Sequence, residues 1–433
     1  MRQLIARGVR AICRQAFMGL LVVGALACAV PMAQAQSPIK LRLFAGGANQ
    51  RPDLVRKLLD EYQKQRPQVR IEIETGGSTS DLQRQYLSTV LNARDPSIDI
   101  YLIDIVNPAQ YLGAGWLEPL NAHLGEPATV LAAQLPVYGQ SNVVNGQLAA
   151  LPGYADAMFL YYRKDLLARH GLPEPRTWDE LATTARRIQQ AEGQPQLQGL
   201  SLQGAPIEGT VCTFLLPYWS QGKSLQDAQG RLTLDRPAAV KGLRQWLSMV
   251  DAGVVKRNVA EVRTGDTVNE FKAGQAIFAV NWSWAWDRFG RDADSRVKGK
   301  VGVMPLPAMA DGQAVTCVGG WQWAVSAFSR HKSEAARVVQ YLSGLDASRF
   351  LAIHGALLPT YQPLYQDPDV LRAVPWFAEV GSVMTAGRSR PISPDYAQVS
   401  DAIRNTTSAV LARTKTPEEG VAQIQSRLAR VLR

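Results

Sequence analysis

The chain has 433 residues, of which 46% are hydrophobic, and it contains 35 glycines and 25 prolines. This length predicts two or three domains at about 150 residues each, and the composition excludes a collagen-like or disordered chain. The formal net charge is +10, but the first 35 residues hold four arginines and no acid, and no run of Lys or Arg exceeds two residues. The charge therefore predicts a solvated basic surface and no nucleic-acid partner.

The N-terminus has the order of a signal peptide. Four arginines precede an apolar stretch at 17–30, and Ala33-Gln34-Ala35 offers the small residues that a signal peptidase recognises. This stretch is too short for a membrane span, which needs about 20 residues. We predict a signal peptide at 1–35 and export to the periplasm. Ala25 stands three residues before Cys28, which disfavours lipid anchoring at that cysteine.

Removal of the first 35 residues would leave two cysteines, Cys212 and Cys317. In an oxidising compartment they could form one disulfide and no other. Sequence gives no distance between the two Cα atoms, so a disulfide and two buried thiols are both compatible with it.

The mature chain opens with alternating strand and helix patterns. Residues 39–44 and 69–74 alternate apolar and polar positions, and 98–103 is a more continuously apolar strand. Apolar residues at helical spacing lie between these strands, and in the second helix they are Leu82, Tyr86, Val90 and Leu91. This order predicts a parallel sheet with right-handed crossovers.

A second α/β pattern begins near residue 150. A strand at 158–162 precedes a helix in which Thr177 and Glu180 form a capping box, and Thr416 with Glu419 begins the last helix in the same way. Further strands are predicted at 276–280, 301–304 and 323–325. Two α/β lobes fit this pattern better than one large sheet, with crossings at 148–155 and 299–307.

The usual signatures of catalysis and metal binding are missing from the sequence. It has no phosphate-binding glycine loop, no nucleophile elbow and no paired-histidine zinc motif. The four histidines are scattered without the spacing of a metal site: His123, His170, His331 and His354. We therefore predict no catalytic residue, no metal and no cofactor, and we expect a protein that is not an enzyme.

Aromatic and acidic side chains stand beside the predicted strand ends. They are Asp104, Tyr154, Asp156, Trp282 and Trp321, with Asn281 and Gly320 next to the tryptophans. Ligands of open α/β sheets bind at the carboxyl ends of strands, and those of two-lobed proteins bind between the lobes. Each residue also has a structural alternative. Packing is the interpretation we favour for Trp284, Trp286 and Trp323, and Asp104 could instead cap a helix.

Aromatic rings, carboxylates and an arginine suit a neutral polyol. Indole and phenol rings cover the apolar face of a sugar ring. Carboxylates accept hydrogen bonds from hydroxyls, and a guanidinium group donates to oxygens. A ligand that lacks the matching hydroxyl leaves a buried protein group unpaired, which provides specificity.

Several segments, in the same order along the chain, resemble one known family. They are Gly-Trp-Leu-Glu-Pro-Leu at 115–120, Leu-Tyr-Tyr-Arg-Lys-Asp-Leu-Leu at 160–167, Thr-Trp-Asp-Glu-Leu at 177–181, Val-Lys-Gly-Lys-Val-Gly-Val at 297–303, Gly-Gly-Trp at 319–321 and Arg-Pro-Ile-Ser-Pro-Asp-Tyr at 390–396. On these segments the chain resembles the periplasmic solute-binding proteins of ABC sugar importers, in particular the trehalose/maltose-binding group. The resemblance covers essentially the whole mature chain.

The resemblance implies an α/β fold of two lobes, each a mostly parallel sheet flanked by helices, joined by hinge segments. The N-terminal lobe would comprise 36–150 and about 307–350, and the C-terminal lobe 151–306 and about 351–433. It also implies ligand contacts from Asp104, Tyr154, Asp156, Glu208, Asn281, Trp282, Gly320, Trp321 and Arg390.

One position departs from the group. After the first Gly-Gly, sugar binders of this group have a glutamate that touches the sugar, whereas Gly46-Gly47 is followed here by Ala48-Asn49-Gln50-Arg51. Gln50 or Arg51 would replace an acceptor by an amide or a cation. This departure puts trehalose in doubt and favours another disaccharide or a related glycoside.

We predict a periplasmic protein that closes around a trehalose-, maltose- or sucrose-like disaccharide. As a monomer, it would deliver the sugar to the membrane permease of an ABC importer with a cytoplasmic ATPase. Contacts from both lobes would stabilise the closed form only when the sugar bridges them. Three alternatives stay open: a secreted glycosidase with Asp104 and Asp156 as acid and base, a binder of a non-sugar solute such as a polyamine or an oligopeptide, and a chemoreceptor-coupled sensor.

Overall fold

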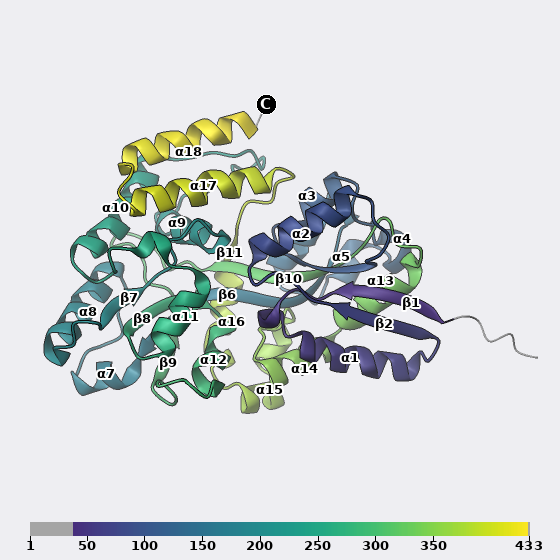
Figure 1. The fold of residues 1–433 in the computed structure, drawn as a ribbon, viewed down its shortest axis with the longest axis horizontal. Coiled ribbons are helices and arrows are strands. Elements are labelled where there is room, and N and C mark those ends of the chain that lie inside the picture. Colours follow the sequence, from purple (N-terminus) through teal and green to yellow (C-terminus); the bar gives the residue numbers. More distant parts are fainter. Residues whose placement is uncertain (1–37, 432–433) are drawn as a thin grey trace, which may run out of the picture. The chain divides into compact units, whose positions relative to one another are not determined.

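The structure is a computed structural model of the chain, and it describes residues 38–431. The predicted signal peptide and Cys28 lie outside the described residues. Residues 38–431 form one compact unit, and Figure 1 shows its helices and strands. Within 38–431, no helix combines the length and apolar character that a membrane span requires.

Within the described residues, nine strands form one mixed sheet and two short strands form a hairpin. The strands are β1 (Ile39–Phe44), β2 (Val69–Glu74), β3 (Ile100–Asp104), β4 (Val143–Val144), β5 (Gln147–Leu148), β6 (Leu151–Arg163), β7 (Gln198–Ser201), β8 (Ala276–Trp282), β9 (Val301–Met304), β10 (Cys317–Val325) and β11 (Arg388–Ser389). The sheet order is β2-β1-β3-β10-β6-β8-β7, with β11 on β10 and β9 on β6. β1 is parallel to β2 and β3, and β7 is parallel to β8, whereas β6 is antiparallel to β8, β9 and β10.

Helices cover both faces of this sheet (Figure 1). They are α1 (Pro52–Gln65), α2 (Ser80–Asn92), α3 (Pro108–Gly113), α4 (Asn121–Leu124), α5 (Pro127–Val130), α6 (Pro136–Asn142), α7 (Lys164–Arg169), α8 (Trp178–Glu192), α9 (Glu208–Ser220), α10 (Arg236–Asp251), α11 (Thr264–Lys272), α12 (Ala285–Arg291), α13 (Lys332–Leu342), α14 (Leu345–Gly355), α15 (Pro368–Ala373), α16 (Phe377–Ala386), α17 (Tyr396–Leu411) and α18 (Pro417–Val431). Three 3-10 turns are η1 (Ala48–Gln50), η2 (Val259–Glu261) and η3 (Gln362–Tyr365).

Local sequence patterns account for the strands. The predicted strands at 39–44, 69–74 and 301–304 coincide with β1, β2 and β9. In β1, Leu41 and Leu43 are buried while the intervening Arg42 is exposed, as alternation requires. The α/β fold class is therefore confirmed, with antiparallel strands in its centre.

Of the two predicted capping boxes, the one at Thr416 is present in full, whereas at Thr177 the Glu180 carboxylate accepts from the Arg176 amide at 2.7 Å in place of the Thr177 amide. Thr177 Oγ1 accepts a hydrogen bond from the Glu180 amide at 3.2 Å, at the start of α8. Thr416 Oγ1 accepts from the Glu419 amide at 3.2 Å, while Glu419 Oε2 accepts from the Thr416 amide at 2.9 Å. These reciprocal bonds satisfy N–H groups that have no partner inside a helix.

The predicted helix between β2 and β3 is present as α2, but not all of the apolar residues that mark it in the sequence are buried. Leu82 and Tyr86 are 49% and 38% exposed. The inner face instead consists of Gln83, Leu87 and Leu91, which follow one another at a spacing of four. One of the three buried positions is a polar glutamine, so a search for apolar residues at helical spacing does not identify this face of the helix.

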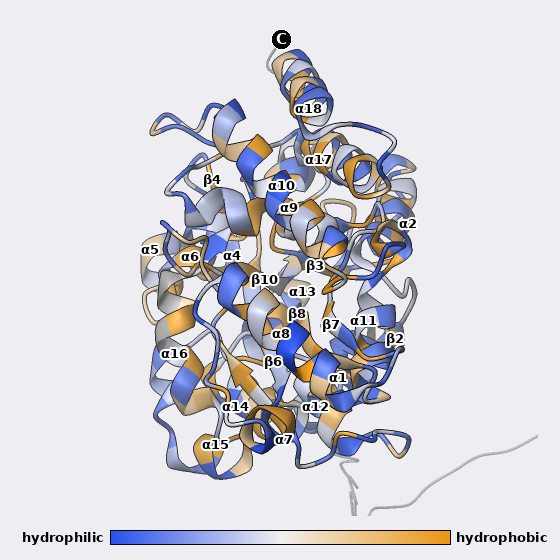
Figure 2. Ribbon diagram, turned by 90° about the vertical axis from the view of Figure 1, so that its left-hand side faces the viewer, coloured by the Kyte–Doolittle hydropathy of each residue, from blue (hydrophilic) through white to orange (hydrophobic). Residues whose placement is uncertain are grey.

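Two large apolar clusters lie at different ends of the sheet. One surrounds β1–β3 with α1 and α13 and includes Leu43, Leu59 and Trp323. Another surrounds β8 with α8–α10, α17 and α18 and includes Trp178 and Ile424. In Figure 2 the ribbon of α18 alternates between hydrophilic and hydrophobic stretches, as expected of a helix with one buried face.

β6 connects the two ends of the sheet as one continuous strand. Its residues 151–157 pair with β10, and its residues 158–163 pair with β8 and β9. The predicted crossing at 148–155 and the predicted strand at 158–162 are thus parts of the same strand, except for 148–150. The lobe boundaries near 150, 306 and 350 stay a prediction.

Cys212 of α9 and Cys317 of β10 form a disulfide, with their Cα atoms 5.9 Å apart. Both residues are fully buried. The bond closes a sequence separation of 105 residues and ties α9 to β10, which restricts the unfolded chain. The question that the sequence left open is answered in favour of the disulfide.

Candidate functional site

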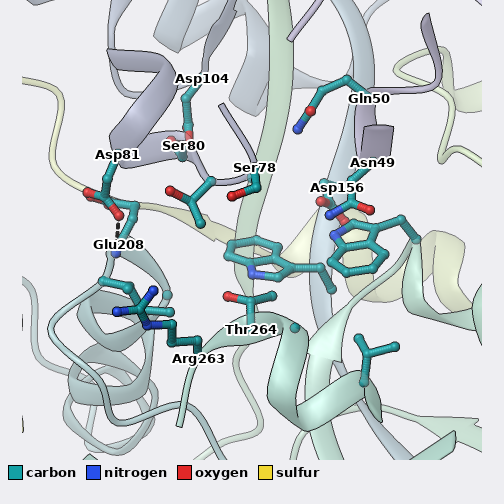
Figure 3. A pocket seen from close by; sticks show the side chains of 18 of the residues that line it. Asn49, Gln50, Ser78, Ser80, Asp81, Asp104, Asp156, Glu208, Arg263 and Thr264 are labelled. Carbon is teal, nitrogen blue, oxygen red and sulfur yellow. Dashed lines mark hydrogen bonds between the residues drawn. The ribbon is translucent and has the colours of Figure 1, made fainter. Parts of the chain in front are cut away.

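A cavity of about 400 Å³ lies at the ends of the central strands (Figure 3). Its walls come from distant parts of the chain: 49–50, 78–81, 104, 156, 207–209, 263–266, 268–269, 272, 282, 284, 288, 292, 319–321 and 390. Seven of the nine predicted site residues line it: Asp104, Asp156, Glu208, Trp282, Gly320, Trp321 and Arg390.

Strand pairing brings these residues together. Trp321 of β10 lies opposite both Asp104 of β3 and Tyr154 of β6. Trp282, the last residue of β8, lies opposite Met158 of β6. The sheet order therefore converts separate strand ends into one surface.

Arg390 bridges two carboxylates in the cavity wall. Its Nη2 donates to Asp104 Oδ1 at 2.8 Å, and its Nη1 donates to Glu208 Oε1 at 2.7 Å. The residue is only 2% exposed. Burial by itself would lower the pKa of Arg390, but the nearby charges of Asp104 and Glu208 raise it well above its ordinary value. Arg390 is therefore a charged residue whose two ion pairs connect β3 and α9.

Glu208 is already saturated by protein donors. Besides Arg390, Tyr396 donates to its Oε1, Ser400 donates to Oε2 at 2.6 Å, and Arg84 Nη1 lies 3.9 Å from Oε2. Burial raises the pKa of Glu208, but the charges of Arg390 and Arg84 outweigh it and hold this pKa below its usual value. Glu208 is thus an ionised carboxylate that holds the wall together.

Asp156 has one engaged oxygen. Its Oδ1 accepts from the Ser283 amide at 3.0 Å, from Ser283 Oγ at 2.6 Å and from the Ala157 amide at 2.9 Å. Its Oδ2 accepts none of these bonds. Burial raises the pKa of Asp156 to about 7, although the bonds from Ser283 oppose the shift. Asp156 therefore changes charge near neutral pH.

Two tryptophans, Trp282 of β8 and Trp321 of β10, line the cavity from the strands on either side of β6. The Trp282 ring lies 5.9 Å from the guanidinium carbon of Arg390, within cation–π range. A Cβ atom on Gly319 would lie 2.7 Å from this ring, so only glycine leaves room for the indole. Gly320 has a φ of +130°, which disfavours any other residue there. The two glycines before Trp321 thus shape the aromatic wall.

Tyr154 and Asn281 do not line the cavity. Tyr154 is 4% exposed within the apolar cluster that contains Trp321, and its hydroxyl has no hydrogen-bond partner among the described residues. Asn281 Nδ2 donates to Thr267 Oγ1 at 2.6 Å, and Asn281 Oδ1 accepts from the Trp282 amide at 2.7 Å. Asn281 therefore fixes the backbone beside Trp282.

Several lining residues were not predicted. Asn49, Gln50 and 78–81 follow the carboxyl ends of β1 and β2, and the strand-end rule could have found them. Residues of α11 and α12 carry no local signal. Trp284, for which packing was the favoured interpretation, also lines the cavity.

The departure after Gly46-Gly47 places an amide in the cavity wall. Gln50 Oε1 accepts from the Gly47 amide at 2.7 Å and from Gln83 Nε2 at 3.1 Å. Because a backbone N–H can only face the oxygen, these bonds fix which way the amide points and leave its Nε2 as the free end. Figure 3 shows Gln50 directed into the cavity. Arg51 pairs with Asp53 instead.

Among residues 38–431 no group of three His, Cys, Asp or Glu side chains is arranged to hold a metal ion. The cavity offers indole faces, carboxylates, amides and guanidinium groups. Such a lining binds a polar solute by stacking and hydrogen bonds.

A family model described as bacterial extracellular solute-binding protein matches residues 48–347. The chain belongs to this family. A probable ABC transporter-binding protein of Deinococcus radiodurans is 35% identical to this solute-binding protein over 365 residues, which are 81% of this chain and 84% of the relative. The finding confirms the resemblance on which the sequence-based identification was made.

Solved structures share the fold of this solute-binding protein. Maltose-bound MalE3 of T. maritima has a TM-score of 0.84 and 33% identity, and the match covers 91% of this chain and 100% of MalE3. The acarbose receptor GacH of Streptomyces glaucescens has a TM-score of 0.80 at 23% identity, covering 91% and 98% of the two chains. The two-lobed α/β fold class is thereby confirmed.

Proposed function

We propose that this solute-binding protein holds a neutral sugar of about disaccharide size in the cavity and delivers it from the periplasm to the permease of an ABC importer. One observation carries the proposal: Trp282 and Trp321 line the same cavity as the acceptors Asp104 and Asp156. Indoles can cover the C–H faces of sugar rings while carboxylates accept from the hydroxyls. The maltose in MalE3, at 33% identity, supports the same ligand class.

Delivery would depend on closure of the two lobes around the sugar. β6 and β10 pair with each other at the centre of the sheet. β10 also pairs with β3 on one side, and β6 pairs with β8 and β9 on the other, so these two are the candidate hinge strands. The lobe boundaries near 150, 306 and 350 are part of this proposal. We expect a monomer that binds its sugar without transforming it.

The alternatives fit the cavity less well. A glycosidase needs one carboxylic acid and one carboxylate free to act, but Asp104 is paired with Arg390 and Asp156 accepts three bonds through one oxygen. A polyamine needs carboxylates that are free to pair with it, but Asp104 and Glu208 are paired with Arg390, and the cations Arg263, Lys272 and Arg288 also line the cavity.

A thermal-shift screen followed by calorimetry would test the function. The melting temperature should rise with maltose, sucrose or a related disaccharide by mass action, and stay unchanged with putrescine or a tetrapeptide. Incubation with the same disaccharides should release no monosaccharide. Binding of none of the sugars would overturn the proposal, and release of monosaccharide at enzymatic rates would favour the glycosidase.

Sugar affinity should rise with pH around neutrality. A hydroxyl donates to the ionised form of Asp156, and the pKa of this residue is raised to about 7 by burial. At lower pH the bound proton competes with the ligand, so the dissociation constant should fall as the pH increases from about 6 to about 8. Calorimetry over this range would measure it. Asp156→Asn should remove the dependence, and an equal slope in that variant would contradict the assignment.

Gln50→Glu should change specificity without disturbing the fold. A glutamate can still accept from the Gly47 amide and Gln83 Nε2, but it replaces the amide donor in the cavity by a charged acceptor. We expect the affinity for the natural sugar to fall about tenfold. The affinity for trehalose should rise relative to that for the natural sugar. The control is Asn49→Asp, which adds the same charge at the next position. Equal effects of both variants in calorimetry would mean that charge, not the amide donor, is responsible.

A further inference from the structure

The N-terminus of α9 is capped by a side chain from a distant helix. Ile207, the residue before α9, offers no side-chain hydrogen bond. Instead, the Glu208 amide donates to Asp81 Oδ2 at 3.0 Å, and Asp81 lies in the first turn of α2. A carboxylate at this position satisfies an N–H group that has no partner within the helix and interacts favourably with the helix dipole.

Two arginines complete the contact. Arg404 of α17 donates to Asp81 Oδ1, and Arg84 of α2 lies 3.3 Å from the same oxygen. Arg84 also reaches Glu208 Oε2 at 3.9 Å. The side chains of Asp81, Arg84 and Arg404 are only 18%, 13% and 16% exposed. Partial burial makes these ion pairs stronger than the same pairs on an open surface.

The partners belong to different ends of the sheet. α2 packs through Leu87 and Leu91 against Phe44 and Tyr101 of β1 and β3. α9 and α17 instead contribute to the apolar cluster around β8. Figure 3 shows Asp81 at the edge of the cavity, joined to the adjacent Glu208 by this hydrogen bond. Asp81 therefore bridges the two proposed lobes beside the cavity.

We propose that Asp81 is a closure residue: it fastens α2 to α9 and α17 when the lobes close, and so sets the affinity for every solute alike. The inference rests on one part of the proposed function, that the lobes close around a solute. It does not depend on which solute is bound. A ligand that needs the closed form binds with an apparent affinity reduced by the fraction of molecules that can close. Loss of the Asp81 side chain lowers this fraction equally for all ligands.

Asp81→Ala should therefore raise the dissociation constants of two different sugars by the same factor, roughly 2- to 30-fold for loss of a helix cap. Asp81→Asn keeps an acceptor oxygen for the Glu208 amide but loses the charge, so it should recover part of the affinity. Asp179→Ala is the matched control. Asp179 also lies in the first turn of a helix, α8, and accepts a hydrogen bond from Gln245 of α10, but both helices contribute to the same apolar cluster, so this bond does not join the two proposed lobes. This control should bind both sugars as the original protein does.

Asp81 also lines the cavity, so a direct ligand contact must be distinguished from closure. A direct contact would change the two dissociation constants by clearly different factors, and that result would overturn the inference, as would unchanged binding. Failure of the original protein to bind any sugar would instead count against the proposed function.

Discussion

Replacement of Arg390 by methionine is expected to destabilise the protein by about 3–5 kcal/mol and to abolish sugar binding. Methionine fills a similar volume but leaves the buried carboxylates of Asp104 and Glu208 without the cation that both contact. Their partial desolvation would then be uncompensated. Chemical denaturation at neutral pH measures the loss of stability, and calorimetry measures the loss of binding.

The effect of Arg390→Met should depend on pH. Arg390 helps to hold the pKa of Glu208 below its ordinary value of 4.5, against the opposing effect of burial. A lowered carboxylate pKa contributes stability above the unfolded-state pKa, and this stability is lost as the pH falls through the folded-state pKa. The difference between the two proteins should therefore narrow in acid.

Arg388→Met is the matched control for this variant. Arg388 lies two residues earlier, is partly exposed, and donates to the Lys223 carbonyl oxygen at 3.0 Å. We expect a small change in stability and normal binding. If Arg390→Met were as stable as the control, the bridge between Asp104 and Glu208 would not hold the cavity wall.

The features that sequence predicted best depend on local physics. Alternation in β1 and β2 and the N-terminal helix caps at Thr177 and Thr416 involve residues close in the chain, so they can be recognised without the fold. Strand ends are also local features. Because β3, β6, β8 and β10 pair with one another, their ends meet in one cavity, as the strand-end rule expects.

The features that sequence missed depend on side-chain direction and distant partners. Successive residues of a strand point to opposite faces, so Asn281 and Trp282 cannot both face the cavity. Asn281 turns toward Thr267 of α11. Near Tyr154 a register shift between β6 and β10 interrupts regular alternation. No pattern along the chain reveals these directions.

The same limit applies to the charged residues. Arg390 and Glu208 were predicted to contact a ligand, and that stays a prediction. In the structure these two side chains form a hydrogen bond with each other, although 182 positions separate them in the sequence. Asp81, 127 positions before Glu208, caps its helix. Such partners become visible only when the chain is folded, because the sequence gives their charges and not their distances.

Trp282→Ala is expected to raise the dissociation constant for the sugar at least tenfold, as loss of a stacking residue at the centre of a binding site does. Trp282 is partly exposed to the cavity, so its removal should leave unfolding cooperative. Trp321→Ala is a less suitable variant, because Trp321 is 8% exposed and truncation of a buried tryptophan costs about 3–5 kcal/mol of stability. Calorimetry and the change in tryptophan fluorescence on adding sugar would measure the effect.

Trp286→Ala provides the control for Trp282→Ala. Trp286 lies four positions later and packs against Trp376, with the two ring centroids 5.4 Å apart. It does not line the cavity. Its loss removes one indole from the fluorescence signal but should keep the sugar-dependent change and the affinity. Equal dissociation constants for Trp282→Ala and the original protein would show that no sugar ring stacks on this indole. In that case the carboxylates and amides alone would have to account for binding, and the case for a sugar over another polar solute would lose its main support.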